Sequence, residues 1–179
     1  MKMLFISDIH GIPDNLEYIE GIIIGKKIDK LVVLGDLYYN DLPYTEDNEN
    51  KAQKVKEFLN KYKNILICMR GNCDSIVDVM SSEFLMIDGL SLIYIDDLNI
   101  YLNHGHIYNR NKNKGFNKGI LVYGHEHIPY IEKKDNMVYI NVGSISLPRD
   151  GNDPTYMIYE NKEFTIYDIY GNIVSNIRI

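Results

Sequence analysis

The spacing of apolar positions changes partway along the chain. In the first part, short apolar runs alternate with stretches whose apolar residues recur at helical spacing. A short apolar run bounded by polar turns is typical of a buried strand, and a period near 3.6 residues is typical of an amphipathic helix. The runs at 2–7, 31–34 and 65–69 predict strands, and the stretches at 13–25, 52–59 and 75–80 predict helices. This alternating order indicates an α/β protein with a parallel sheet.

The remaining part of the chain is rich in short β-like runs. Many of them alternate apolar and polar residues, and turn sequences such as Lys134-Asp135-Asn136 separate them. The runs lie at 84–87, 91–95, 99–102, 119–123, 130–132, 137–141, 155–159, 164–168 and 172–177. They predict a second, mostly antiparallel sheet packed on the first, within a single domain that spans residues 1–179.

Polar side chains follow the ends of the first three predicted strands. Asp8 and His10 follow the first strand, Asp36 follows the second and Asn72 follows the third. The carboxyl ends of parallel strands share one edge of a sheet, where open α/β sheets bind ligands, so we expect these side chains to lie together. Each histidine of the chain also lies just beyond an apolar run: His10, His104, His106, His125 and His127.

These residues form a mixed nitrogen and oxygen ligand set that is too large for one tetrahedral ion. The pair His125 and His127 alone would fit an ordinary surface loop, and only its combination with the other motifs indicates a site for two cations. Two ions about 3.5–4 Å apart need a bridging carboxylate to offset their repulsion, and Asp36 is the expected bridge. Such a pair attracts a phosphate group and acidifies a bridging water.

Composition narrows the range of partners and compartments. The chain has 19 basic and 25 acidic residues, a formal charge of −6, and no basic stripe, so a long nucleic acid is not an expected partner. The first apolar run is too short for a signal core or a membrane span and ends at Asp8, which predicts a cytoplasmic protein without a membrane partner. Cys68 and Cys73 are expected to be reduced thiols.

The motifs together resemble the calcineurin-like metallophosphoesterases, and most closely their small bacterial and archaeal phosphodiesterases of the YfcE type. The resemblance implies a four-layer αββα sandwich of two packed mixed β-sheets flanked by helices. It extends along essentially the whole chain, through Ser7-Asp8-Ile9-His10-Gly11, Gly35-Asp36, Arg70-Gly71-Asn72-Cys73-Asp74, His104-Gly105-His106, Gly124-His125-Glu126-His127 and Asn141-Val142-Gly143-Ser144.

The resemblance also implies how the metal ligands are shared. One ion would be held by Asp8, His10, Asp36 and His127, and the other by Asp36, Asn72, His104 and His125. The expected cofactors are two divalent ions, with Mn²⁺ favoured by the resemblance and Zn²⁺, Fe or Ni²⁺ compatible with the same ligands. The expected reaction is attack of a metal-bridging hydroxide on a small phosphodiester. The expected catalytic residues are Asp36, Asn72, Cys73 and His106.

Cys73 departs from the wider superfamily, many of whose members have at this position a histidine that contacts phosphate and is often assigned as the general acid. The YfcE-type subgroup shares this cysteine. A neutral thiol is a poorer proton donor, so we expect leaving groups that need little protonation, stabilised by metal, by solvent or by His106. Cys73 as a small filler beside the metals is the alternative interpretation.

Several residues near the motifs carry weaker expectations. Arg70 is expected either to reach a phosphate or to make a surface ion pair. Asn40 and Asp41, in a polar loop at 38–49, are expected to support the ligands or to form a turn. Glu126 is expected to face solvent, and most tyrosines are expected to pack on strands.

Two other functions remain open at this point. One is a phosphomonoesterase or nucleotidase with the same metal centre, and the other is a non-catalytic scaffold that uses this fold to bind proteins. A homo-oligomer is compatible with the subgroup and with exposed β edges in the second sheet.

Overall fold

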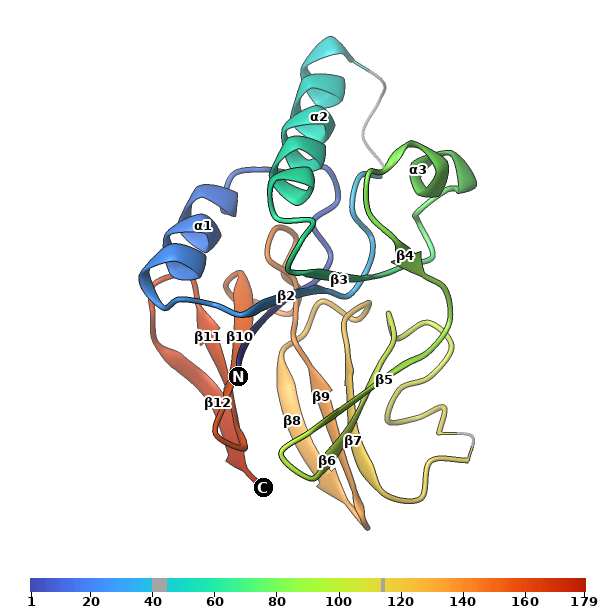
Figure 1. Ribbon diagram of the computed structural model, residues 1–179, viewed down its shortest axis with the longest axis vertical. Helices are drawn as coiled ribbons and strands as arrows, with labels where there is room; N and C mark the ends of the chain where they lie inside the picture. The colour runs from blue at the N-terminus through green and yellow to red at the C-terminus, as the bar shows by residue number, and fades with distance from the viewer. Residues whose placement is uncertain (40–44, 114) are drawn as a thin grey trace.

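Two β-sheets pack face to face, and helices cover the outer face of the larger sheet (Figure 1). The computed structural model describes residues 1–39, 45–113 and 115–179, so Asn40 and Asp41 lie outside the described residues. Within them the larger sheet has the strand order β12-β11-β10-β1-β2-β3-β4. Its strands are β1 (Lys2–Ile6), β2 (Lys30–Val33), β3 (Leu66–Met69), β4 (Met86–Ile87), β10 (Thr155–Glu160), β11 (Glu163–Asp168) and β12 (Ile173–Arg178).

The smaller sheet has the order β5-β6-β7-β9-β8. Its strands are β5 (Ser91–Ile95), β6 (Leu98–Leu102), β7 (Gly119–Tyr123), β8 (Tyr130–Lys134) and β9 (Met137–Asn141). The three central strands β6, β7 and β9 are parallel to one another, and the two edge strands pair antiparallel. Both sheets are therefore mixed, because β1 to β4 are parallel and β10 to β12 continue that sheet by antiparallel pairing.

The α/β fold of two mixed sheets with flanking helices is confirmed, but the expected composition of the second sheet is wrong. The runs at 84–87, 155–159, 164–168 and 172–177 belong to the first sheet, as β4, β10, β11 and β12. The second sheet is also not mostly antiparallel, since its central strands are parallel. Local alternation of apolar and polar residues predicts that a strand exists, whereas its partner and direction depend on contacts between residues far apart in sequence.

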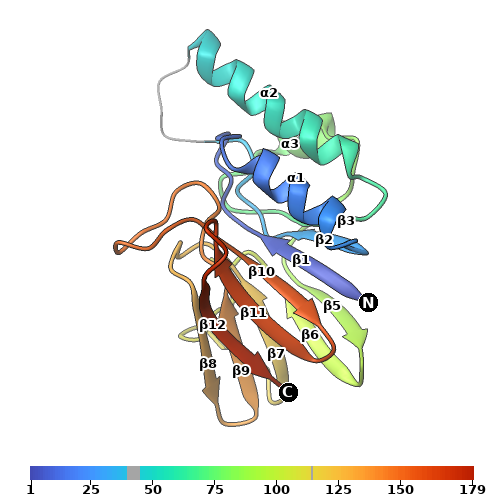
Figure 2. The same cartoon turned by 90° about the vertical axis from the view of Figure 1, so that its left-hand side faces the viewer.

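The helices are α1 (Leu16–Gly25), α2 (Glu46–Lys61) and α3 (Ile76–Ser81). Figure 2 shows α1 and α2 stacked over the parallel strands, while β10, β11 and β12 extend the sheet away from them. Helix α2 begins earlier than its apolar stripe predicts, because the Thr45 side chain accepts a hydrogen bond from Asn48 N at 3.2 Å and acidic residues fill its first turn. None of the helices among the described residues is both long and apolar enough to cross a membrane.

Two apolar clusters hold the layers together. One lies between the helices and the first sheet and includes Leu4, Ile19 and Val55. The other lies between the two sheets and includes Phe5, Val122 and Ile140. On the outer face of the second sheet, Tyr123 and its neighbours pack against side chains from the segment between β6 and β7. Tight packing on both sides of the strands fixes where their ends emerge.

Candidate metal centre

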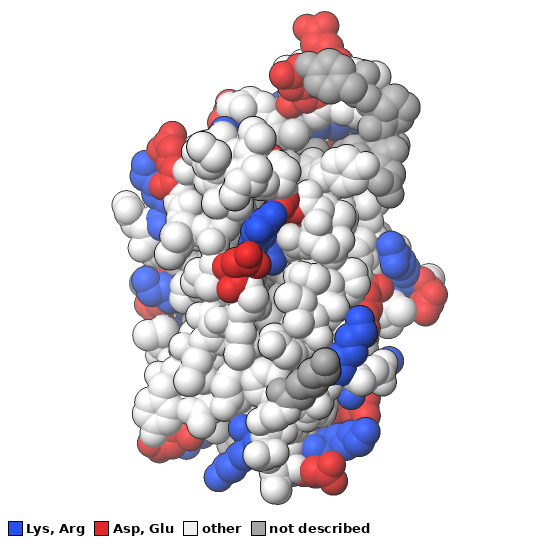
Figure 3. Space-filling view, turned by 90° about the vertical axis from the view of Figure 1, so that its right-hand side faces the viewer, with Lys and Arg blue, Asp and Glu red and all other residues white. Residues whose placement is uncertain are grey.

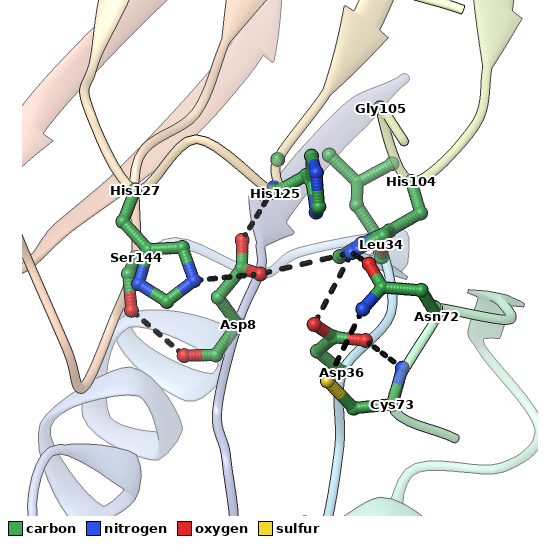
Figure 4. A network of polar contacts seen from close by, with 12 residues as sticks. Asp8, Leu34, Asp36, Asn72, Cys73, His104, Gly105, His125, His127 and Ser144 are labelled. Carbon is green, nitrogen blue, oxygen red and sulfur yellow. Dashed lines mark hydrogen bonds and ion pairs between the residues drawn. The ribbon is translucent and has the colours of Figure 1, made fainter. Parts of the chain in front are cut away.

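The carboxyl ends of parallel strands from both sheets meet at one edge of the sandwich. Asp8 follows β1 and Asp36 follows β2, while His104 follows β6 and His125 follows β7. Because β6 and β7 run parallel, their ends emerge on the same side, which an antiparallel pair would not allow. Figure 4 shows the resulting group, with Asp8, Asp36 and Asn72 facing His104, His125 and His127.

The backbone at this edge is held in an unusual conformation. Five of the expected ligands have positive φ angles between 51° and 66°: Asp8, His10, Asp36, His125 and His127. Left-handed backbone costs a non-glycine residue on the order of 1–3 kcal/mol and is concentrated at functional sites. Hydrogen bonds between adjacent loops maintain it, since Asp8 N–H donates to Gly35 O at 3.1 Å and His10 N–H donates to Asp36 O at 2.9 Å.

Three of the histidines are oriented by backbone carbonyl groups. The Nδ1 atom of His10 lies 2.6 Å from Tyr39 O, that of His104 lies 2.8 Å from Leu34 O, and that of His127 lies 2.6 Å from Leu147 O. A carbonyl oxygen only accepts hydrogen bonds, so Nδ1 must carry the proton in each ring. In the neutral imidazole, Nε2 then offers its lone pair to the centre, which is the usual arrangement of metal-binding histidines.

The atoms that face the centre are carboxylate and amide oxygens together with Nε2 atoms of histidines. Asp36 Oδ2 lies 3.2 Å and Asn72 Oδ1 lies 3.1 Å from Nε2 of His104, and Asp8 Oδ1 lies 3.2 Å from Nε2 of His127. Asp8 Oδ1 is buried and makes no hydrogen bond within the described residues. A neutral imidazole with its proton on Nδ1 cannot donate to any of these oxygens, so the arrangement needs added positive charge.

The donors form three overlapping groups that can each hold a cation. The first is Asp8, His10 and His127, the second is Asp36, His104 and His125, and the third, of His10, Asp36 and Cys73, shares a residue with each of the other two; within each group the ligand atoms lie within 4.8 Å of one another. Asn72 lies beside the second group through its contact with His104. Asp36 also approaches the first group, with Oδ2 3.7 Å from His10 Nε2. Imidazole nitrogen with carboxylate oxygen suits divalent transition metals.

The pKa shifts of these groups point to the same need for positive charge. Burial would raise the pKa of Asp8 and Asp36, but the neighbouring histidines outweigh it and lower both. Burial opposes protonation of His104, yet its hydrogen bond to Asp36 and the charges of Asp8 and Asp36 raise its pKa to about 9. The carboxylates are thus held ionised, and the raised pKa of His104 favours a proton at the place where a divalent ion would supply positive charge.

The buried carboxylate of Asp74 supports the ligand loops, a role that the sequence did not reveal. It accepts hydrogen bonds from the backbone N–H groups of Asp36 at 2.9 Å, Leu37 at 2.7 Å and Gly71 at 2.7 Å. Asp74 therefore ties the loop after β2 to the loop after β3. An aspartate right beside the Gly-Asn motif is the one signal that could have indicated it.

Ser144 supports the part of the site that contains Asp8 and His127. Its hydroxyl donates to Asp8 O at 2.7 Å and accepts from Leu147 N–H at 2.8 Å. Leu147 O in turn orients His127. This chain of hydrogen bonds couples the positions of Asp8 and His127, and the Asn-Val-Gly-Ser stretch noted in the sequence supplies it.

Three further residues from the sequence analysis, Cys73, His106 and Arg70, lie beside the metal ligands or at the surface. Cys73 is half-buried; its N–H donates to Asp36 Oδ1 at 2.9 Å, and its Sγ accepts from Asn72 Nδ2 at 3.3 Å. His106 lies beside the site, its ring centroid 5.5 Å from that of His104 and 6.1 Å from that of His125. Arg70 makes the surface ion pair, 3.4 Å from Asp88.

Glu126 does not simply face solvent, which corrects the expectation from the sequence. It is half-buried and accepts hydrogen bonds from Tyr130 OH at 2.8 Å and from Asn141 Nδ2 at 3.4 Å. Tyr130 OH also contacts Tyr123 OH. These tyrosines therefore anchor the turn between His125 and His127 as well as packing on the sheet.

A cavity of about 370 Å³ opens over the site. Its lining consists of predicted metal ligands together with Cys73, Glu126 and Arg149. Arg149 is a residue that the sequence analysis did not single out. The backbone of Arg149 is fixed, since its N–H donates to His127 O at 3.1 Å and its carbonyl accepts from Asn152 Nδ2 at 2.8 Å. A larger cavity of about 530 Å³ lies at the opposite end of the second sheet, and no histidine lines it.

Comparison with known proteins gives consistent matches. The model of the calcineurin-like phosphoesterase superfamily domain matches residues 1–163. Phosphodiesterase YfcE of Escherichia coli K12 is 33% identical over 168 residues, covering 93% of this chain and 91% of the relative. Probable metallophosphoesterase YsnB of Bacillus subtilis is 26% identical, covering 99% of this chain and 97% of the relative. The solved structure of the E. coli phosphoesterase YfcE superposes with a TM-score of 0.90 at 31% identity, covering both chains completely.

Proposed function

The chain belongs to the calcineurin-like phosphoesterase superfamily, and on this premise we propose that it is a metal-dependent hydrolase of small phosphodiesters. The observation that carries the proposal is the convergence of overlapping groups of metal-binding side chains under one cavity. We take residues 1–179 as a single catalytic domain. The similarity to a named phosphodiesterase over nearly the whole chain supports a diester as the substrate.

In this proposal two divalent ions bind, with Mn²⁺ as the favoured metal. Asp8, His10, Asp36 and His127 would hold one ion, and Asp36, Asn72, His104 and His125 the other. The donor set fits such ions, because the three carbonyl-bound histidines present Nε2 and the carboxylates stay ionised. When bound, the ions supply positive charge for the phosphate oxygens and lower the pKa of a water so that hydroxide forms near neutral pH.

The protein's own residues would bind and orient the substrate. Arg149 lines the cavity beside the expected ligands, and no hydrogen bond or ion pair occupies its guanidinium group within the described residues. We assign the guanidinium group of Arg149 to a non-bridging, anionic phosphate oxygen of the diester, because a guanidinium pairs well with such oxygens. His106, at the edge of the site, is assigned to contact with phosphate.

Protonation of the leaving group would be weak in this site. Cys73 lies against Asp36 and Asn72, and the resemblance to the wider superfamily implies that a proton donor often stands at this position. A neutral thiol donates a proton poorly to an alkoxide. The proposed substrates are therefore diesters with leaving groups that need little protonation.

A panel of chromogenic esters tests the function. Chelator-treated protein reloaded with Mn²⁺ should hydrolyse bis(4-nitrophenyl) phosphate and contain two ions per chain by metal analysis. Faster hydrolysis of 4-nitrophenyl phosphate than of the diester would favour a monoesterase instead. Fewer than two ions together with no hydrolysis of either ester would support a non-catalytic scaffold.

Asp36→Asn is the matched variant for this experiment. It keeps the shape of the side chain but removes the charge expected to bridge the ions, so turnover should be lost while the circular dichroism spectrum is retained. A fully active variant would contradict the two-metal proposal. We also propose that the protein is a homo-oligomer.

A further inference from the structure

One acidic side chain in the cavity over the site has no place in the metal centre. The aspartate, asparagine and histidines that line this cavity are expected metal ligands, and Cys73 and Arg149 have roles in the proposed function. Glu126 is the remaining lining residue, and it comes from the turn between His125 and His127. Its carboxylate lies where a bound diester would meet it.

Two donors fix the position of this carboxylate. Tyr130 OH donates to Glu126 Oε2 at 2.8 Å, and Asn141 Nδ2 donates to the same oxygen at 3.4 Å. The other oxygen, Oε1, makes no hydrogen bond to a described residue, yet it is not one of the buried polar atoms that lack a partner. Glu126 thus has one oxygen held by the protein and one that is accessible beside the cavity.

A chain of hydroxyl groups directs its protons toward Glu126. Because the single hydroxyl proton of Tyr130 goes to Glu126, the Tyr130 oxygen accepts from Tyr123 OH. The Tyr123 oxygen in turn accepts from Arg110 N–H at 3.0 Å. The guanidinium group of Arg110 also lies over the Tyr130 ring, 4.1 Å from its centroid. This chain suits a negative charge at its end, because each hydrogen bond polarises the next.

The carboxylate of Glu126 has no cationic partner within the described residues. Arg110 pairs instead with Glu132 at 3.2 Å, and no ion pair joins Glu126 to Arg149. A carboxylate repels the anionic phosphate oxygens of a diester, which therefore belong beside Arg149 and the metal ligands. The part of the substrate that Glu126 can contact is an ester group.

The two sheets contribute different residues to the cavity. Cys73 follows β3 of the larger sheet, and Glu126 follows β7 of the smaller sheet. The proposed function places the leaving group beside Cys73. The ester group that stays on the phosphate, the retained group, is then the one that meets Glu126.

The outer surface offers no competing basis for selection on the face shown in Figure 3. Lysine and arginine side chains are scattered there among acidic ones and among uncharged surface, without a continuous basic patch in the described part of the chain. A long polyanion is therefore not held on this face. Selection among small diesters falls to side chains within the cavity.

We propose that Glu126 selects diesters whose retained group carries a hydrogen-bond donor, either an ammonium or a hydroxyl group. A carboxylate oxygen only accepts hydrogen bonds, so Oε1 pairs with such a donor. An apolar retained group would displace water from Oε1 without replacing its hydrogen bond, which costs binding free energy. This inference rests on the proposed function, because it takes a phosphodiester as the substrate.

Diesters with one leaving group and different retained groups test the proposal. Protein reloaded with Mn²⁺ is given the 4-nitrophenyl diesters of ethyl, 2-hydroxyethyl, 2-aminoethyl and choline phosphate. Since 4-nitrophenolate leaves in each case, differences in kcat/KM arise from the retained group. The value for the 2-aminoethyl or the 2-hydroxyethyl diester should exceed that for the ethyl diester roughly 10-fold, because a hydrogen bond to a charged group is lost in the latter.

The four diesters also separate the sources of such a preference. A preference for the 2-aminoethyl diester alone identifies an ammonium group, and one for the 2-hydroxyethyl diester identifies a hydroxyl group; either supports the proposal. The choline diester is cationic but has no donor on its nitrogen, so it should be hydrolysed more slowly than the 2-aminoethyl diester. Equal values for all four, or for the choline and 2-aminoethyl diesters, would overturn the proposal.

A matched pair of variants locates the preference at Glu126. Glu126→Gln should reduce it roughly 5-fold, because the charge-assisted hydrogen bond becomes a neutral one. Glu20→Gln on α1 is the control, since Glu20 is also half-buried and accepts from a tyrosine hydroxyl, that of Tyr62 at 2.6 Å. An unchanged preference in Glu126→Gln, or an equal loss in Glu20→Gln, would overturn the proposal.

Tyr130→Phe provides a second variant that keeps the carboxylate but removes a donor that fixes it. Its preference should lie between those of the wild type and Glu126→Gln, and a preference equal to that of the wild type would show that the hydroxyl chain does not orient Glu126. Thermal unfolding checks that each variant is folded.

Calorimetric titration of the metal-loaded protein with the reaction products separates this inference from the proposed function. Ethyl phosphate and 2-aminoethyl phosphate can bind without turnover. Tighter binding of 2-aminoethyl phosphate that is lost in Glu126→Gln would support the role of Glu126 even in a protein that hydrolyses no diester. Hydrolysis of the diesters with equal binding of the two products would overturn the inference and leave the proposed function intact. Binding of neither product, together with no hydrolysis, would overturn both.

Discussion

The Nε2 atom of His10 lies 3.3 Å from the Nε2 atom of His127. Each ring places its Nδ1 atom against a backbone carbonyl group, of Tyr39 and of Leu147, so Nδ1 carries the proton in both. In the neutral rings two bare lone pairs would then face each other, which is stable only with a cation or an extra proton between them. Asp8 Oδ1, 3.2 Å from His127 Nε2, adds a negative charge at the same point.

Metal loading should therefore stabilise the protein against unfolding. A ligand that binds only the folded state at about 100 times its Kd adds about 2.7 kcal/mol, which for a chain of this size raises Tm by roughly 5–10 °C. Differential scanning calorimetry of chelator-treated protein with and without Mn²⁺ measures the shift. His127→Asn should reduce it. An identical Tm with and without metal would argue against a cation at this position.

Gly71→Ala should lower kcat/KM strongly, although Gly71 does not line the cavity. A Cβ atom at Gly71 would overlap Asp36 Oδ1 and the backbone nitrogen of Asp36. Displacing a reacting group by about 1 Å can cost on the order of 100-fold in rate, so we expect at least that loss in kcat/KM.

Gly21→Ala on α1 is the control, because its Cβ atom would have no neighbour within 4 Å. Replacing this helical glycine should leave turnover unchanged and stabilise the fold by about 0.5–1 kcal/mol. Retained activity in Gly71→Ala would show that the position of Asp36 is less constrained than its contacts indicate.

Cys73→His should change which diesters are hydrolysed well. An imidazole at this position can donate a proton to a poor leaving group, and general acid catalysis contributes at least about 100-fold in favourable cases. The rate ratio of an alkyl diester to a nitrophenyl diester should rise on the order of 10-fold or more. An unchanged ratio would count against a protonation role at this position and favour Cys73 as a filler.

Arg149→Gln should weaken substrate binding more than turnover. Loss of one charge-assisted hydrogen bond at an exposed site costs about 1.5 kcal/mol, so KM for the diester should rise roughly 10-fold while kcat changes little. Arg178→Gln, at the opposite end of the sandwich and paired with Glu163, is the control. Equal effects of the two variants would point to overall charge and not to a contact with substrate.

Asp168 should make the stability of the β11–β12 turn depend on pH. Burial opposes ionisation of this carboxyl, but the hydrogen bonds that it accepts from Asn172 and Tyr170 lower its pKa below 3.8. A lowered native pKa means that its contribution is complete above the unfolded pKa and is lost as the pH falls through the native value.

Urea unfolding of Asp168→Ala measures this contribution. The variant should lose about 2 kcal/mol near pH 7 and progressively less as the pH falls below the ordinary aspartate pKa of 3.8. The exposed Asp153→Ala should show little change at any pH. A loss of stability in Asp168→Ala that is independent of pH would contradict a role for the ionised carboxylate.

Much of the fold can be predicted from local pattern. The β1, β2 and β3 runs and helices α1 and α2 are visible as apolar spacing, because buried strands and amphipathic helices must match their sequence to the period of the backbone. The sheet to which a strand belongs cannot be predicted from local pattern in the same way. The last strands alternate like those of the second sheet, yet β10 pairs with β1 and extends the first sheet. That choice depends on contacts across the whole chain, which no local window contains.

The sequence by itself determined the chemistry of the site: which residue types are present, that each follows a strand, and that a cysteine stands where a histidine is common. Only the tertiary structure decided how they meet. The parallel pairing of β6 and β7 places His104 and His125 on one edge, and Asp74 and Ser144 hold the loops by hydrogen bonds between residues far apart in sequence. Spacing along a chain specifies which face or end a residue occupies, but distances across a site arise from the packing of one sheet on the other.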